Sequence, residues 1–259
     1  MKPLRLAVAA TLAALSFSAH AVGRLADVSI LDRATGRELP VTWHEGRAYV
    51  VGRPGNEYQV QLRSQRGEDL LAVVSVDGVN ALSGETASTR QGGYVLSPWS
   101  RFDIRGWRKS LDEIAAFYFT SLGDSYAART ARPQNVGVIG VALFQRKRYR
   151  EEAPGAFFAP KREGMPKLQQ GPAEAQSSDR AAESRAMPSA PLGTGHGRRE
   201  ESRVHWVDFE RASDEPAETI AIYYDSYRNL VARGILRSPV APRDPEPFPT
   251  AFVADPPWR

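Results

Sequence analysis

Asp77, His196 and Glu200 have types and surroundings that could support acid–base chemistry. Asp77 stands with Gly78 at the end of an apolar run, and His196 lies in the glycine-rich sequence 193–197, four residues before Glu200. A carboxylate and an imidazole within reach of one another can transfer a proton during hydrolysis. The same residues also suit structural roles, because an Asp-Gly pair favours a turn and glycines let a loop lie close to a neighbouring backbone. We favour the structural interpretation and assign none of the three as catalytic.

Other catalytic classes lack their residues in this sequence. There is no Cys, which excludes thiol nucleophiles, disulfides and cysteine metal ligands. No serine lies in a Gly-x-Ser-x-Gly sequence, and the glycine-rich sequence lacks the lysine of a phosphate-binding loop. His44, His196 and His205 have no spacing typical of metal ligands. We therefore expect no metal and no cofactor.

Aromatic side chains could instead build a binding surface. Trp99 and Trp107 flank an expected strand, and with Tyr126 they are candidate ligand-binding residues. An indole ring that stays exposed can stack on an apolar face of a ligand such as a sugar. Most aromatic residues of a β domain this size lie in its core or pack on turns, so exposure of one of these would favour a glycan-binding face.

The first residues have the three parts of a secretory signal peptide. Lys2 and Arg5 supply positive charge, residues 6–17 form an apolar run, and positions 19–21 have the small-residue pattern of a cleavage site. The apolar run is shorter than the ~20 residues that a spanning helix needs. We therefore expect residues 1–21 to be removed, which leaves a periplasmic or secreted protein with no transmembrane segment.

The charge of the chain is not that of a nucleic-acid-binding protein. The chain carries 34 Lys and Arg against 30 Asp and Glu, and loss of Lys2 and Arg5 with the signal reduces the net charge to about +2. Nucleic-acid binding requires cations clustered on one face. The basic run 146–150 is followed at once by two glutamates. We expect no nucleic acid among the partners.

Much of residues 22–145 follows the two-residue period of half-buried strands, with turn residues at short intervals. In the clearest example, Tyr58, Val60 and Leu62 alternate with polar residues. These three side chains should face a core while their neighbours face solvent.

Two other segments are continuously apolar, which predicts central strands covered on both faces: 70–76 and 136–144. Residues 111–120 fit either a strand or a buried helix, and their aromatic and β-branched residues favour a strand from Ile114 onward. Together these patterns predict a mainly β, antiparallel, sandwich-like domain of about seven to ten strands.

The second half is less regular. Residues 146–197 are rich in Pro, Ala, Gly, Gln, Ser and charged residues, so we expect a flexible low-complexity excursion. Within 198–236 we expect a strand pair, over 204–209 and 219–224, followed by a short helix. The last residues, 237–259, form a Pro-rich tail.

The short helix has both of its boundary signals. Asp225 or Ser226 can act as N-cap, Leu230 provides an inward face, and Gly234 suits the left-handed stop. Because two strands and one helix do not make a stable domain alone, residues 198–236 should dock on the first β domain.

Several segments resemble an uncharacterised family of exported proteobacterial proteins. They are AVVSVDGVN (72–80), GYVL (93–96), GWRKS (106–110), NVGVIG (135–140), LGTGHG (192–197), DFERAS (208–213), YDS (224–226) and NL (229–230). The resemblance implies an exported location and a single intact module, and it carries no activity or site residues.

The sequence thus favours a non-catalytic binding or structural module of the cell envelope, whose partner is another envelope protein or a glycan. The alternative is a small periplasmic hydrolase that uses carboxylates and His196. A polar pocket that holds Asp77, Tyr126 and His196 together would favour the hydrolase, and an exposed aromatic patch would favour the binding module.

Overall fold

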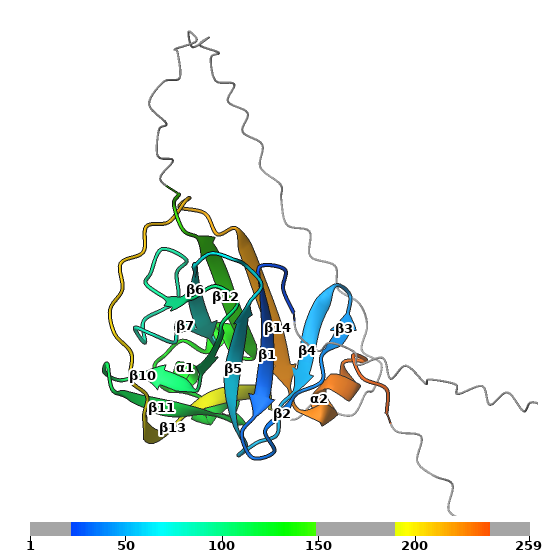
Figure 1. Ribbon diagram of the computed structural model, residues 1–259. Coiled ribbons are helices and arrows are strands. Elements are labelled where there is room, and N and C mark those ends of the chain that lie inside the picture. Colours follow the sequence, from blue (N-terminus) through cyan, green and yellow to red (C-terminus); the bar gives the residue numbers. More distant parts are fainter. Residues whose placement is uncertain (1–21, 149–189, 239–259) are drawn as a thin grey trace, which may run out of the picture.

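The protein folds into two β-sheets packed face to face, with two short helices at the edges (Figure 1). The computed structural model describes residues 22–148 and 190–238. Residues 1–21, expected to be a signal peptide, and the tail beyond residue 238 lie outside the described residues, as does most of the expected flexible excursion. The prediction of a mainly β, sandwich-like fold is confirmed.

Sheet A contains seven strands in the order β10-β11-β5-β1-β2, with β13 paired to β11 and β9 paired to β5. All its pairings are antiparallel. Its strands are β1 (Ala26–Asp32), β2 (Arg37–Glu38), β5 (Glu57–Ser64), β9 (Arg101–Ile104), β10 (Gly106–Arg108), β11 (Glu113–Ser121) and β13 (Leu192–Glu201).

Sheet B also contains seven strands, in the order β3-β4-β14-β12-β6-β7, with β8 paired to β6. One pair, β4 with β14, is parallel, which departs from the all-antiparallel expectation. Its strands are β3 (Thr42–His44), β4 (Arg47–Val51), β6 (Leu70–Val76), β7 (Val79–Asn80), β8 (Tyr94–Leu96), β12 (Val138–Gln145) and β14 (Glu218–Asp225).

The main core lies between the two sheets and follows the predicted alternation. Tyr58, Val60 and Leu62 are fully buried on β5, and Ile220 and Ile222 of β14 belong to the same apolar cluster. The outer face of sheet B has a second, smaller cluster, formed by Leu71, Val73, Ala142 and Phe144 with Phe209 packed against them. The expectation that β6 and β12 are covered on both faces is therefore confirmed.

The structure corrects the prediction for residues 192–209. Residues 192–197, expected to belong to the flexible excursion, form the first part of β13, because glycines there fit closely against β11. Residues 204–209, expected to be a strand, are outside any sheet ladder, and Trp206 is largely exposed. The segment expected to pair with them, which is β14, pairs with β12 and β4 instead.

The helix signals are confirmed in α2 (Tyr227–Ala232). The Ser226 hydroxyl accepts the N–H of Asn229, and Gly234 has a φ of 74°. Leu230 and Ile235 then pack on Tyr49 of β4, which docks the helix on sheet B.

The other helix, α1 (Tyr126–Arg129), has Ser125 as its N-cap and lies against β13. Two short 3₁₀ turns flank it, at Leu122–Asp124 and Pro133–Asn135. Among the described residues, no helix has the length and apolarity needed to cross a membrane.

Candidate functional site

Two buried carboxylates fasten the start of β13 to the end of sheet B. Asp77 lies in the tight β6–β7 turn, with φ values of 53° at Asp77 and 73° at Gly78, and Asp225 is the last residue of β14. Asp77 Oδ2 accepts the N–H of Thr194 at 2.7 Å, and Asp225 Oδ1 accepts the N–H of Leu192 at 3.3 Å. These backbone donors lie on the edge of β13 that faces away from β11, so the carboxylates satisfy groups that would otherwise be unpaired.

Asp77 is completely buried and receives two further hydrogen bonds. Its Oδ1 accepts the Tyr224 hydroxyl at 2.5 Å and the N–H of Gly137 at 2.9 Å. Burial raises the pKa of Asp77 to about 6, and the hydrogen bonds from Tyr224, Thr194 and Gly137 oppose that rise. The turn role predicted for Asp77 is present, and the carboxylate also joins three segments distant in sequence.

A chain of hydroxyls continues from Asp77 into the core. Thr194 Oγ1 lies 2.7 Å from the Tyr224 hydroxyl and 2.5 Å from the Tyr58 hydroxyl. Because the single Tyr224 proton is donated to Asp77, the remaining protons run from Tyr58 to Thr194 and from Thr194 to Tyr224. Burial, together with the charge of Asp77, raises the pKa of both tyrosines well above its ordinary value. The chain therefore stays protonated and has a structural role.

His196 lies apart from the carboxylates. Its ring centroid is 5.5 Å from that of Tyr126, which in turn lies 5.0 Å from the ring of Trp107. Burial and then the nearby charge of Lys109 lower the pKa of His196. Within residues 22–148 and 190–238, no hydrogen bond or ion pair connects His196 with Asp77 or Glu200.

Glu200 belongs to an ion-pair network that pins β13 to the ends of β1 and β5. It receives both terminal nitrogens of Arg33, at 2.9 and 3.0 Å, and also pairs with Arg198 at 2.9 Å. Glu57 completes the network by pairing with the same two arginines. Hydrogen bonding from Arg198 and the charge of Arg33 lower the pKa of Glu57 against the effect of burial.

The three aromatic candidates divide between core and surface. Trp107 is only 2% exposed and packs edge-on against Phe117, so it has no free face for a ligand. Tyr126 is half-buried between Trp107 and His196. Trp99 is 66% exposed and lies in the turn between β8 and β9. Burial thus removes Trp107 from the candidates, and Trp99 alone among the three offers an open ring.

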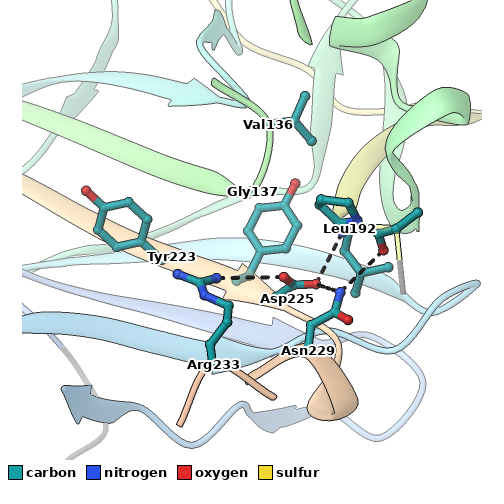
Figure 2. Close-up of a pocket in the computed structure, with 10 residues that line it drawn as sticks. Val136, Gly137, Leu192, Tyr223, Asp225, Asn229 and Arg233 are labelled. Atoms are coloured by element: carbon teal, nitrogen blue, oxygen red, sulfur yellow. Dashed lines mark hydrogen bonds and ion pairs between the residues drawn. The ribbon is translucent and has the colours of Figure 1, made fainter. Parts of the chain in front are cut away.

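Figure 2 shows a pocket of about 470 Å³ at the end of β14, next to the Asp77 network. Asp225 lies at its base, where Oδ1 accepts the side-chain amide of Asn229 at 2.7 Å and Oδ2 lies 3.7 Å from a terminal nitrogen of Arg233. Tyr224 and Gly137 line the pocket and also donate hydrogen bonds to Asp77. The lining residues are Val136, Gly137, Ala190, Pro191, Leu192, Tyr223, Tyr224, Asp225, Asn229 and Arg233.

None of the six residues singled out from the sequence lines this pocket. Asp225 was recognised only as a possible N-cap, and that role falls to Ser226. No local pattern marks Arg233 or Val136, because the pocket forms where segments distant in sequence meet.

The described residues contain no cluster of three or more His, Asp or Glu side chains that could hold a metal ion. Comparison of the chain with protein-family models, with curated proteins and with solved structures gave no match.

Proposed function

We propose that this protein is a non-catalytic binding module and that the pocket at the end of β14 holds its ligand. The arrangement of ionisable groups carries the proposal. Asp225 and Arg233 in the pocket face each other, while Asp77, His196 and Glu200 lie outside it, fixed in separate structural contacts. General acid–base catalysis needs such groups to converge on one reacting bond.

The pocket walls indicate a small polar ligand with oxygen acceptors. Val136, Pro191 and Leu192 give apolar surface, and Tyr223 adds an aromatic ring. The Arg233 guanidinium is half-exposed. In the part of the chain described it forms an ion pair with Asp225 at 3.7 Å, which is longer than a hydrogen bond, and it lies 5.6 Å from the centre of the Tyr49 ring. Its donors can therefore meet the hydroxyl or carboxylate oxygens of a sugar or of a peptide end. Apolar walls with a few placed polar groups are usual for ligand sites.

The envelope setting is part of the proposal and rests on the sequence of the N-terminal segment. The charged start, the apolar run and the small residues at 19–21 fit export and cleavage before Val22. The partner is then an envelope glycan or an envelope protein. Mass spectrometry of the protein from its native cells should find an N-terminus within a few residues of Val22, and an intact Met1 in the mature pool would contradict export.

Binding can be tested by calorimetric titration with sugars and short peptides, after a thermal-shift screen. Arg233→Ala should weaken binding by about tenfold or more, because it removes the guanidinium donors that line the pocket. Val136→Phe should also weaken it by filling the pocket. Arg228→Ala is the matched control, since Arg228 is an exposed arginine of α2 that does not line the pocket. Equal losses in all three variants would count against the pocket as the site.

The hydrolase alternative requires a different result. The purified protein would turn over an ester, peptide, phosphate or glycosidic substrate, and His196→Ala would abolish that turnover while leaving the melting temperature unchanged. We expect no such turnover, because among the described residues no hydrogen bond or ion pair joins the His196 side chain to an acid or base.

A further inference from the structure

Trp99 occupies a backbone conformation that a bulky residue rarely adopts. Ser97 and Ser100 close a turn through the bond from Ser100 N–H to Ser97 O at 3.2 Å, with Pro98 second and Trp99 third. The φ of Trp99 is 55°, and a positive φ at the third position is the pattern of a type II turn, which favours Gly. Such strain costs about 1–3 kcal/mol. Since the ring is two-thirds exposed, burial does not offset this cost.

Neighbouring backbone holds the turn in place. The Trp99 N–H donates to Arg66 O at 3.1 Å, and Ser64 N–H donates to Ser100 O at 2.9 Å. The indole lies over Gly67, where a Cβ added to the glycine would be 3.7 Å from the indole Nε1. The ring is thus presented at a fixed place above the β5–β6 connection.

Three arginines surround this position. Arg63 on β5 and Arg101 on β9 lie directly opposite each other, and both are exposed. Arg66 follows in the connection that holds Trp99. Their side chains make no hydrogen bond or ion pair within the described residues. Like charges directly opposite each other on a sheet repel, and Asp27, which lies opposite Arg63 on β1, offsets part of that repulsion.

The nearby acidic groups are already engaged. Glu68 pairs with Arg148 at 2.5 Å, and Asp69 pairs with Arg146 at 3.0 Å. Asp27, opposite Arg63 on β1, and Asp103 on β9 accept hydrogen bonds from the side chains of Gln65 and Gln61, which carry no positive charge to pair with them. The three arginines near Trp99 therefore outnumber these two carboxylates by one, which leaves a small positive excess.

We propose that Trp99, Arg63, Arg66 and Arg101 form a binding surface for an acidic polysaccharide. An indole can stack on the C–H face of a sugar ring, and guanidinium groups bind carboxylate or sulfate groups bidentately. A polysaccharide chain repeats both features, so one sugar can lie on Trp99 while its neighbours meet the arginines. This surface lies at the end of β5 remote from the pocket, and the inference does not depend on the pocket ligand.

The first test is titration of the full mature chain with polygalacturonate, with neutral dextran as the comparison. Trp99→Gly is the informative variant, because Gly adopts the positive φ without strain. We expect it to weaken binding by about tenfold or more while the melting temperature stays the same or rises. If Trp99→Gly lowers the melting temperature and leaves binding unchanged, the ring is structural and the proposal fails.

The arginines are tested with Arg63→Gln and Arg101→Gln. Each should weaken binding and reduce its salt dependence. Arg101→Gln should do so without loss of stability, because it removes one member of the like-charge pair. Arg37→Gln on β2 and Trp206→Ala are matched controls at other exposed positions. An equal loss in Arg37→Gln would indicate nonspecific charge attraction and overturn the proposal.

Other polyanions separate the remaining classes of partner. Binding to single-stranded DNA or to phosphatidylglycerol vesicles, without binding to polygalacturonate, would overturn the assignment to a polysaccharide. Arg233→Ala should leave polygalacturonate binding intact, so that failure of the pocket proposal and failure of this one give different results.

Discussion

The Asp77 carboxylate is held between two opposing effects. Three hydrogen-bond donors, from Tyr224, Thr194 and Gly137, stabilise its charge, while complete burial disfavours the charge. The burial effect is larger, so the pKa rises from 3.8 to about 6. The carboxylate therefore links the stability of the fold to pH.

We expect the contribution of Asp77 to stability to fall as pH rises. The folded protein binds the proton more tightly than the unfolded chain does, so this contribution is complete below the unfolded pKa of 3.8 and is lost as pH passes about 6. The shift corresponds to about 3 kcal/mol as an upper figure. Urea unfolding of the wild type and of Asp77→Asn, across this range of pH, measures the difference in free energy of unfolding.

The variant serves as its own control for other groups, because Asp32 and Glu57 titrate in both proteins. The difference between wild type and Asp77→Asn should shrink or reverse as the pH rises. Tyr224→Phe removes the donor to Oδ1 and should move the transition to higher pH. A difference that stays constant from acid to neutral pH would show that Asp77 has an ordinary pKa in the folded protein.

At the scale of elements, β13 depends on close approach at its glycines. A Cβ on Gly193 would lie 2.5 Å from the Cβ of Ser125 and 2.7 Å from a methyl group of Val136. Ser125 is buried and caps α1, so it cannot move freely. Gly193 also lies between Leu192 and Thr194, whose backbone N–H groups donate hydrogen bonds to Asp225 and Asp77.

Gly193→Ala should therefore destabilise the protein by about 1–3 kcal/mol through overpacking. Gly123→Ala is the matched control, because nothing lies within 4 Å of the added Cβ. The control should change stability by less than about 0.5 kcal/mol. Chemical denaturation measures both, and similar values for the two variants would mean that β13 is not closely packed at this point.

The local sequence pattern correctly predicted several of the elements. The alternation in β5, the apolar runs of β6 and β12, and the capping residues of α2 each have a direct physical cause within a few residues of sequence. The start of β13 was missed because its composition is that of a loop, and its strand pairing comes from fit to β11. Residues 204–209 were wrongly predicted as a strand because alternation alone does not supply a ladder partner.

The candidate site was less predictable than the fold. The sequence drew attention to Asp77 and to the glycine-rich sequence, and these do meet through Thr194. The sequence provided no distance between Asp77, in the β6–β7 turn, and Asp225, at the end of β14. The exposure of Trp99 was left open, and its strained backbone follows from the turn and its contact with Arg66.

At the scale of the whole molecule, the two described parts of the chain are interleaved. Residues 190–238 supply β14, which lies between β4 and β12 in sheet B, and β13, which pairs along β11 in sheet A (Figure 1). Residues 22–148 supply all the other strands. Each part therefore leaves apolar surface and unpaired strand edges exposed when the other is absent.

This interleaving predicts that the two parts fold only together. Residues 22–148 and 190–238, produced as separate chains, should each lack cooperative unfolding, because β12 and β4 lose the strand between them and Ile220 and Ile222 lose the core around them. Production of both parts in one cell should restore a complex that copurifies and unfolds cooperatively, as followed by circular dichroism. Below about pH 4, where the contribution of Asp77 is complete, Asp77→Asn in the larger part should weaken that complex, because Asp77 binds Thr194 of the smaller part. A cooperative transition in residues 22–148 alone would show that the first part is a domain in its own right.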